Sequence, residues 1–223
     1  MAPIQFGILM IPYQMLDVSG PVDILSSSSK ALIAHYEAAG LFPGMAGLSS
    51  KAIDIEFHHI NTTMEPVLMT ANINLLPTTT VDTCPPLDYL LIGGPDPLTF
   101  KLDEKFADFI RKHVDAGKGV FTTCTGGLAI SSSGVLDGRT ATTNHQALDM
   151  ARQLRPQVNW VKEQWVEDGQ FWTAGGACAG MDMFSHWVAK HYAPEIAQVG
   201  LAGLDFEPRD IEGKRALRAE QVV

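Results

Sequence analysis

Runs of apolar residues alternate with amphipathic segments along most of the chain. Residues 4–11, 88–94 and 118–124 are apolar on both faces, which is typical of strands buried in a parallel sheet. Residues 52–60 instead alternate between apolar and polar positions, as in a strand with one exposed face. We therefore predict strands at these four places.

Helical patterns fill much of the chain between these strands. Ser19 is a candidate N-cap of a helix over 19–29, with Pro21 near its first turn. The stretch 103–117 carries its apolar residues on one stripe and ends at Gly117. Further helices are expected at 126–136, 145–154 and 179–193.

The order of these elements predicts an α/β fold in which helices cover both faces of a mainly parallel central sheet. Residues 159–176 have the pattern of a β-hairpin with Asp168 and Gly169 as its tight turn. Residues 36–52 and 205–223 are weakly patterned. No repeat or change of composition divides the chain, so we expect a single domain over 1–223.

Charge and composition narrow the possible partners. The 223 residues carry a formal net charge of −9, which disfavours non-specific binding to nucleic acid or to an anionic membrane. No stretch is long and apolar enough to span a bilayer, and the N-terminus lacks the basic start of a signal peptide. We expect a cytoplasmic protein whose partner is a small-molecule substrate.

The three cysteines, Cys84, Cys124 and Cys178, are widely spaced and form no CxxC pair. A disulfide framework or zinc site is therefore not expected. The adjacent pair His58 and His59 would point to opposite faces of a strand, so these side chains cannot easily share a metal ion. We predict neither a metal nor a cofactor.

Cys124 stands where a buried strand turns into a helix, ahead of Gly126 and Gly127. A helix N-terminus lowers the pKa of a thiol, and glycines permit a sharp turn that leaves the sulfur uncrowded. This is the geometry of a nucleophile elbow, although Thr122 replaces its usual first glycine. The pattern alone also fits a buried core cysteine.

Other polar residues fall at the carboxyl ends of the predicted strands, where ligands bind in such sheets. Asp17 follows the first strand, and Gly94 ends the strand at 88–94. From the pattern alone, an N-cap of the helix at 19–29 is the favoured role for Asp17. Cys178 fits either a lining position in the same crevice or a small packing residue, and His145 fits either a position at the pocket or a capping or packing role.

Four motifs resemble the ThiJ/PfpI superfamily, in its order and at similar spacing: "LDVSGPVDIL" (16–25), "CPPLDYLLIGG" (84–94), "CTGGLAISSSGVLDGRTATTNH" (124–145) and "TAGGACAGMDM" (173–183). The resemblance spans about 1–190 and is greatest to the isocyanide hydratase branch. It implies a flavodoxin-like α/β sandwich with the cysteine on a nucleophile elbow, usually in a homodimer.

The resemblance also implies roles for individual residues. Asp17 matches an aspartate that faces the nucleophile, Thr125 matches the threonine after it, and Gly94 matches a glycine whose N–H points into the pocket. Cys178 replaces a threonine of the hydratases. Thr125 also stands where relatives with protease or glyoxalase roles carry histidine, which argues against a Cys–His dyad.

The resulting expectation is a hydratase in which Cys124 attacks an isocyanide and Asp17 transfers protons, giving an N-formamide. Three alternatives stay open from the sequence. One is a redox or electrophile sensor built on a reactive thiol. The others are a glyoxalase or small-molecule hydrolase that uses the same nucleophile, and a non-catalytic ligand-binding domain.

Overall fold

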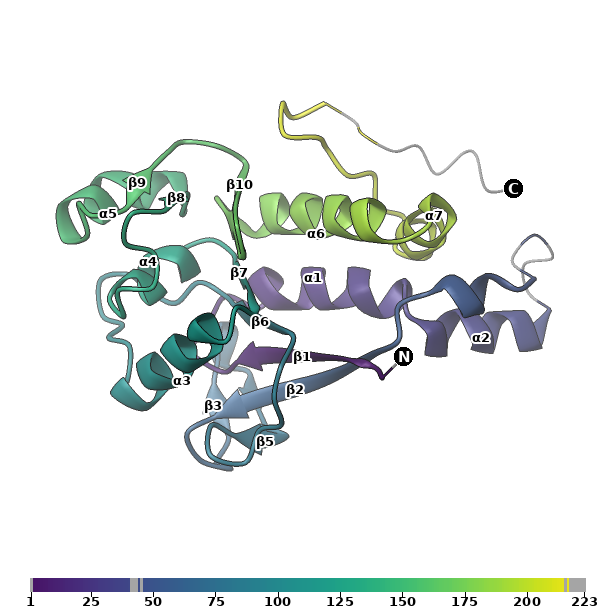
Figure 1. Cartoon of the computed structure of the whole chain (residues 1–223), viewed down its shortest axis with the longest axis horizontal. Coiled ribbons are helices and arrows are strands. Elements are labelled where there is room, and N and C mark those ends of the chain that lie inside the picture. The colour runs from purple at the N-terminus through teal and green to yellow at the C-terminus, as the bar shows by residue number, and fades with distance from the viewer. Residues whose placement is uncertain (1, 41–43, 45, 215, 217–223) are drawn as a thin grey trace.

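The computed structural model describes residues 2–40, 44, 46–214 and 216, and is built around one seven-stranded sheet (Figure 1). The strand order is β10-β11-β7-β6-β1-β2-β5, and every neighbouring pair is parallel except β10 with β11. The strands are β1 (Ile4–Leu9), β2 (Ile55–Asn61), β5 (Thr79–Thr80), β6 (Tyr89–Ile92), β7 (Gly119–Thr122), β10 (Trp165–Asp168) and β11 (Phe171–Ala174). The predicted mainly parallel sheet is confirmed.

Helices lie on both faces of this sheet. The chain moves in one direction across the sheet from β1 to β2 and in the opposite direction from β6 to β7. Because such crossovers are right-handed, α1 (Leu16–Ser27) and α3 (Glu104–Asp115) lie on opposite faces. The helices α6 (Ala177–His191) and α7 (Pro194–Gly203) pack beside α1 (Figure 1).

An aromatic cluster fills the space between the sheet and α6. Phe121 of β7 packs against Phe184 with ring centroids 4.5 Å apart, and the ring of Trp187 meets it edge-on at 5.8 Å. Phe6 of β1 lies 6.1 Å from Phe184. These rings are buried. The apolar side chains on one face of the predicted strands therefore pack against α6.

The first helix begins earlier than predicted. It starts at Leu16, so Ser19 lies inside the helix and is not its N-cap. Asp17 is in the first turn, where an acidic residue is favoured by the helix dipole, and Pro21 is an interior residue. The alternative role of Asp17 as an N-cap is therefore wrong.

The helix after Cys124 is shorter than the predicted 126–136. Helix α4 covers only Gly126–Ser131. The hydroxyls of Ser131, Ser132 and Ser133 donate to carbonyl oxygens three residues back, at 2.7–2.9 Å, and so compete with continued helix. Gly134 then adopts a positive φ of 87°.

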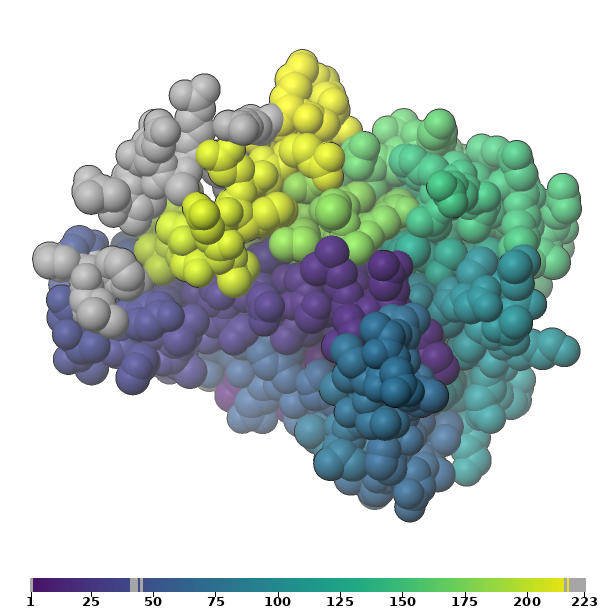
Figure 2. Space-filling view, turned by 180° about the vertical axis from the view of Figure 1, so that it is seen from behind, coloured from purple at the N-terminus to yellow at the C-terminus, as the bar shows by residue number. Residues whose placement is uncertain are grey.

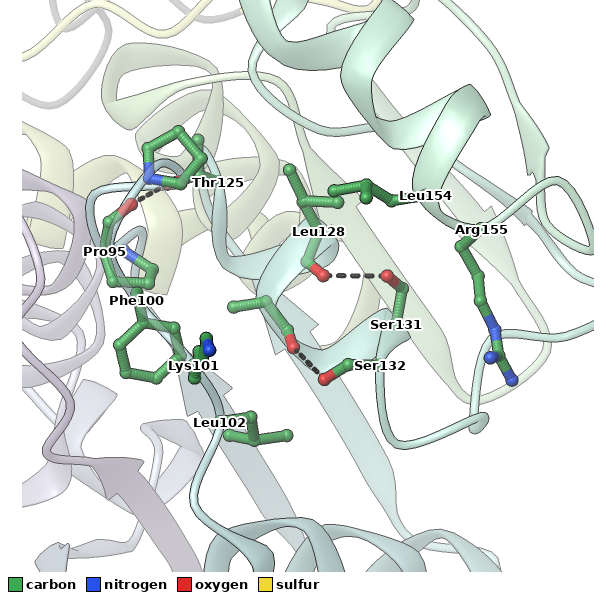
Figure 3. A pocket seen from close by; sticks show the side chains of 12 residues that line it. Pro95, Phe100, Lys101, Leu102, Thr125, Leu128, Ser131, Ser132, Leu154 and Arg155 are labelled. Carbon is green, nitrogen blue, oxygen red and sulfur yellow. Dashed lines mark hydrogen bonds between the residues drawn. The ribbon is translucent and has the colours of Figure 1, made fainter.

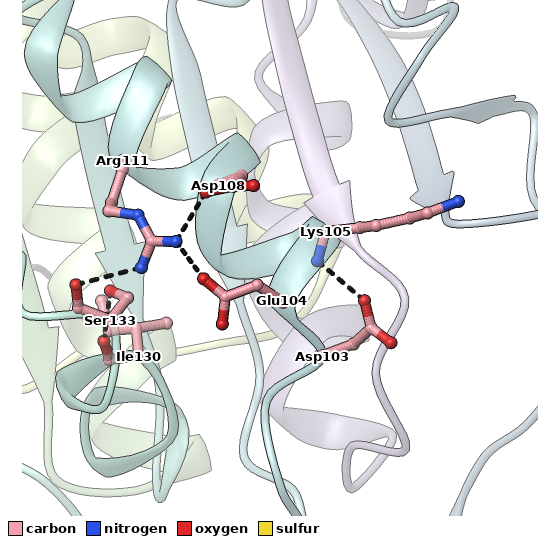
Figure 4. Close-up of polar contacts among 7 residues, drawn as sticks. All are labelled: Asp103, Glu104, Lys105, Asp108, Arg111, Ile130 and Ser133. Carbon is pink, nitrogen blue, oxygen red and sulfur yellow. Dashed lines mark hydrogen bonds and ion pairs between the residues drawn. The ribbon is translucent and has the colours of Figure 1, made fainter.

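Helix α3 matches its prediction closely. Asp103 is its N-cap and accepts from the amide of Lys105 at 2.8 Å, and Gly117 has a positive φ just beyond the helix. Arg111 donates to Asp108 of the same helix at 2.6 Å and to the carbonyl of Ser133 beyond α4 at 3.5 Å (Figure 4). This side chain joins α3 to the turn that follows α4.

Several elements were not predicted or were placed differently. Helix α2 (Lys30–Ala39) begins before the weakly patterned region 36–52 and runs into it, the 3-10 turn η2 (Leu48–Lys51) lies within that region, and α7 follows the last predicted helix. The hairpin is confirmed at β10 and β11, with Gly169 at a φ of 61°, whereas β9 (Asn159–Trp160) pairs with β8 (Thr140–Ala141). Of the predicted segment 205–223, residues 215 and 217–223 lie outside the described residues.

A short two-stranded excursion, β3 (Val67–Leu68) with β4 (Asn74–Leu75), stands out from the body beside the chain that follows β1. Figure 2 shows this excursion in blue next to the dark purple β1–α1 segment. The amide of Thr70 donates to the carbonyl of Tyr13 at 3.4 Å. The excursion therefore forms one wall above the carboxyl end of β1.

Candidate functional site

The carboxyl ends of three neighbouring strands bring together Asp17, Gly94 and Cys124. Asp17 follows β1, Gly94 follows β6, and Cys124 follows β7. The direction of the chain across the sheet reverses between β1 and β6, and ligands of open α/β sheets bind at such a switch point. The structure therefore unites three of the predicted site residues.

Cys124 has the backbone of a nucleophile elbow. Its φ is +54°, a left-handed conformation that is uncommon for a residue with a side chain. Its carbonyl oxygen accepts from Thr143 Oγ1 at 2.9 Å and from the Asn144 amide at 3.0 Å. The segment after β8 thus holds the turn in place.

The carboxyl group of Asp17 is fully buried. Its Oδ2 accepts from the Gly94 amide at 3.1 Å, while Oδ1 has no hydrogen-bond partner among the described residues. Burial raises the pKa of Asp17 from 3.8 to about 6, although hydrogen bonds from Gly94 and from the Cys124 side chain oppose the rise. Asp17 therefore exchanges a proton near neutral pH.

The pKa of the Cys124 thiol is raised, which is the opposite of the expected lowering. Burial is the main cause, and the negative charge of Asp17 adds to it. Donors on Asn144 and Thr125 act the other way. The prediction relied on a helix dipole, but α4 has only six residues and does not outweigh burial and the neighbouring carboxylate.

Asn144 is a site residue that the sequence analysis did not single out. Its Nδ2 donates to the sulfur of Cys124 at 3.3 Å, and its Oδ1 accepts from the Gln146 amide at 3.0 Å. The second bond caps the 3-10 turn η4 (His145–Ala147) and fixes the orientation of the amide. A polar residue directly before a predicted helix was the available signal.

Gly94 and Thr125 lie at the site but are differently engaged than expected. The Gly94 N–H, expected to point at the substrate, is bonded to Asp17. A Cβ at Gly94 would lie 2.6 Å from Thr125 Oγ1 and 2.9 Å from Asp17 Oδ2, so only glycine fits there. The Thr125 hydroxyl donates to the Pro95 carbonyl at 2.6 Å.

Two predicted site residues lie away from the sulfur. Cys178 is exposed at the start of α6 and does not line the cleft over Cys124. His145 is also not a lining residue of this cleft, and its Nε2 lies 2.8 Å from the Glu163 carbonyl oxygen. Cys84 is half-buried, and burial raises its pKa to about 11.

An open cleft of about 820 Å³ leads to Cys124. Its rim combines residues of the β1–α1 turn, the excursion, the segment after β6 and residues 144–150. It is rich in apolar side chains: Met15, Leu16, Ile73, Leu98, Ala147 and Met150. A second hollow of about 390 Å³ shares Pro95, Pro97 and Thr125 with it (Figure 3). Pro95 and Pro97 thus separate the two spaces.

Within the described part of the chain, no three His, Cys, Asp or Glu side chains are grouped so as to hold a metal ion. The same residues contain no helix with the length and apolar character needed to cross a bilayer. The reactive groups at the site are the thiol of Cys124, the carboxyl group of Asp17 and amide donors.

Comparison with curated proteins identifies relatives that are similar to this chain in sequence. The chain is 30% identical over 207 residues to isonitrile hydratase of Pseudomonas putida. The aligned region covers 92% of this chain and 79% of that protein. It is 28% identical over 163 residues to deglycase PfpI of Pyrococcus furiosus, covering 73% and 78%.

Solved structures and a family model agree. The crystal structure of a ThiJ/PfpI family protein from Pseudomonas syringae superposes with a TM-score of 0.74 at 21% identity, covering 94% of this chain and 78% of that one. This likeness confirms the flavodoxin-like α/β sandwich. The model of the DJ-1/PfpI family matches residues 16–190. The chain therefore belongs to the DJ-1/PfpI family.

Proposed function

We propose that the protein hydrates a small isocyanide to an N-formamide, with Cys124 as nucleophile and Asp17 as the proton-transfer group. One observation carries the proposal: a buried carboxyl group with a pKa of about 6 faces a protonated thiol at the floor of a largely apolar cleft. An isocyanide is uncharged and slender at its reacting carbon, which suits such a cleft. The similarity to an isonitrile hydratase supports the same reaction.

In the first step, Asp17 accepts the thiol proton as the sulfur attacks the terminal carbon of R–N≡C. Asp17 then delivers that proton to the same carbon, giving the thioimidate R–N=CH–S–Cys124. A raised thiol pKa is compatible with this step because the neighbouring base removes the proton only during attack. No charge remains on the adduct.

In the second step, water adds to the thioimidate carbon. Asp17 accepts a proton from the water and passes it to the nitrogen, giving R–NH–CH(OH)–S–Cys124. Asp17 then accepts the hydroxyl proton as the carbon–sulfur bond breaks to release R–NH–CHO. The donors from Asn144 and Thr125 lower the pKa of the sulfur and so assist its departure as a thiolate. Proton return from Asp17 restores the thiol.

The same geometry speaks against two of the alternatives. A redox sensor needs a thiol that is readily ionised, whereas burial and Asp17 raise the pKa of Cys124. A Cys–His dyad of the glyoxalase kind needs a histidine at the sulfur, and none lines the cleft within the described residues. Hydration by a Cys–Asp pair is the function that the site supports best.

The test compares an alkyl isocyanide with methylglyoxal, following formamide and lactate separately by NMR. We expect isocyanide turnover in the wild type, none in Cys124→Ala, and a loss of at least about 100-fold in Asp17→Asn. Cys178→Ser serves as a matched thiol control and keeps full activity. Full isocyanide turnover in Cys124→Ala would disprove the proposal.

The family resemblance also leads us to propose that the chain forms a homodimer. Light scattering after size-exclusion chromatography tests this: a mass of twice 24.2 kDa supports it, and a mass of 24.2 kDa contradicts it.

A further inference from the structure

Thr123 lies in the chain directly before Cys124, and its side chain contacts the other half of the catalytic pair. Its hydroxyl donates to the backbone carbonyl oxygen of Asp17 over 2.8 Å, and the bond is fully buried. This is a direct link between the turn that carries the nucleophile and the helix that carries the carboxyl group. The mechanism above does not use it.

The sequence of α1 explains why that carbonyl is available. In a regular helix, the carbonyl of Asp17 would accept from the amide of the residue four positions later. That residue is Pro21, which has no N–H to donate. A proline inside a helix normally costs stability, but here it leaves an acceptor that Thr123 satisfies from outside the helix.

The backbone of Thr123 joins two more elements of the site. Its amide donates to the Ile92 carbonyl at the end of β6 at 3.1 Å, and its carbonyl accepts from the Gly126 amide at the start of α4 at 2.9 Å. Its methyl group packs closely over Gly180 of α6, where an added Cβ would lie 2.5 Å from Thr123 Cγ2. One residue thus connects β6, α4 and α1.

We propose that Thr123 is a positioning residue that sets the separation between the Asp17 carboxyl group and the Cys124 sulfur by tying α1 to the end of β7. Besides the bond from its own amide to the Gln14 carbonyl at 2.9 Å, Asp17 is tied to the other strand ends by the Gly94 amide at its carboxyl group and by the Thr123 hydroxyl at its backbone carbonyl. Removing the bond from Thr123 lets the first turn of α1 relax away from the sulfur. The activity readout rests on the proposed function, whereas the thiol readout below does not.

Thr122 provides a matched control one position earlier. It is also fully buried, but its hydroxyl has no hydrogen-bond partner among the described residues. Thr122→Val and Thr123→Val are therefore the same change of shape at adjacent buried positions, and only the second removes a bond. Thr122→Val is expected to match the wild type.

A second pair of variants distinguishes a positioning role of Thr123 from the mere supply of a hydrogen-bond donor to the Asp17 carbonyl. In Thr123→Val with Pro21→Ala, the new amide at position 21 donates to the Asp17 carbonyl within α1. The carbonyl of Asp17 then has a hydrogen-bond donor again, so the stability lost in Thr123→Val is regained, but α1 is no longer tied to β7. Pro21→Ala alone keeps the Thr123 bond and is expected to behave as the wild type.

The experiment measures the rate of Cys124 alkylation by iodoacetamide from pH 6 to 10, in a background with Cys84→Ser and Cys178→Ser. Asp17 is the charged group facing the sulfur, and Asn144 and Thr125 are neutral. In Thr123→Val, and equally in the double variant, we expect the pH midpoint of the alkylation profile to fall. The alkylation rate at pH 7 should rise by about three- to tenfold. Thr123→Ser restores the wild-type midpoint.

Isocyanide turnover is the second readout, with an expected loss in kcat on the order of 10- to 100-fold for both Thr123→Val proteins and little change in KM. A wild-type alkylation profile in Thr123→Val or in the double variant would overturn the proposal, whatever its stability. A wild type that alkylates as described but hydrates no isocyanide would refute the proposed function and leave the positioning role intact.

Discussion

The amide nitrogen of Gly94 lies 3.1 Å from Oδ2 of Asp17 and joins the end of β6 to the first turn of α1. The bond orients a carboxyl group that is otherwise surrounded by the protein interior. It also uses the N–H that the family resemblance assigned to the substrate. Gly94 therefore acts on the carboxyl group, and sulfur stabilisation falls to Asn144 and the Thr125 amide.

Gly94→Ala is predicted to disable the site with a smaller effect on stability. The added Cβ would lie 2.6 Å from Thr125 Oγ1, 2.7 Å from the Thr125 amide nitrogen and 2.9 Å from Asp17 Oδ2. Both catalytic segments must then move, and we expect a loss of isocyanide turnover on the order of 100-fold. Gly176→Ala is the control, because its Cβ meets nothing within 4 Å and its backbone is extended. Equal activity of the two proteins would contradict the role of Gly94.

Asn144→Leu is predicted to raise the pKa of Cys124 further. The change keeps the size of the side chain but removes the donor 3.3 Å from the sulfur, which favours the thiolate. We expect severalfold slower alkylation of Cys124 at pH 8 and a turnover loss on the order of 10- to 100-fold. Asn159→Leu is the control, because it changes an exposed amide on β9, the strand that pairs with β8. It should leave the alkylation rate of Cys124 and the turnover unaltered. Unchanged alkylation in Asn144→Leu would exclude this contact as a source of thiolate stabilisation.

Asp17 makes the folded state less stable as the pH rises. Its folded pKa of about 6 exceeds 3.8, so the native state holds the proton more tightly than the unfolded chain does. The free energy of unfolding therefore falls between about pH 4 and pH 6, by about 3 kcal/mol at most. Asp17→Asn, which keeps an oxygen acceptor for Gly94, removes this loss.

Urea unfolding at two pH values measures this effect. Asp17→Asn should be more stable than the wild type at pH 7.5, by on the order of 2 kcal/mol, and nearly equal at pH 4. A variant that is less stable at pH 7.5 would show that the carboxylate is not penalised by burial.

Cys178→Ser is predicted to keep full activity. Cys178 is exposed and lies outside the cleft, so its thiol reacts with alkylating reagents without affecting turnover. Limited iodoacetamide at pH 7, followed by peptide mass spectrometry, should label Cys178 before Cys124. The raised pKa of Cys84 predicts the slowest labelling there. Turnover that declines in step with Cys178 labelling would return this residue to the site.

The sequence sufficed for the fold where periodicity was strong. The buried strands at 4–11, 88–94 and 118–124 and the amphipathic helix at 103–117 all appear close to their predicted places. The predicted start of α1 was wrong because Ser19 resembles an N-cap, whereas the helix begins at Leu16 with no side-chain cap. Helix α2 was missed because its few buried positions leave little periodicity.

The site was predictable in its membership and not in its electrostatics. The carboxyl ends of parallel strands place Asp17, Gly94 and Cys124 together, which spacing can anticipate. The depth of burial and the carboxylate facing the sulfur decide the direction of the Cys124 pKa, and both depend on tertiary packing. The Asn144 contact spans 20 residues of sequence, and the local pattern, a polar residue directly before a predicted helix, indicates a cap and not this contact with Cys124.

We infer that Asp17 and Cys124 share one proton, which resides on the sulfur at neutral pH. The most direct test is the pH dependence of Cys124 thiolate absorbance at 240 nm, in a background with Cys84→Ser and Cys178→Ser, with and without Asp17→Asn. We predict a thiol pKa above its ordinary value in the wild-type pair and a lower one once the carboxylate is removed. A wild-type thiol already ionised at pH 7, or a pKa that rises in Asp17→Asn, would contradict the account.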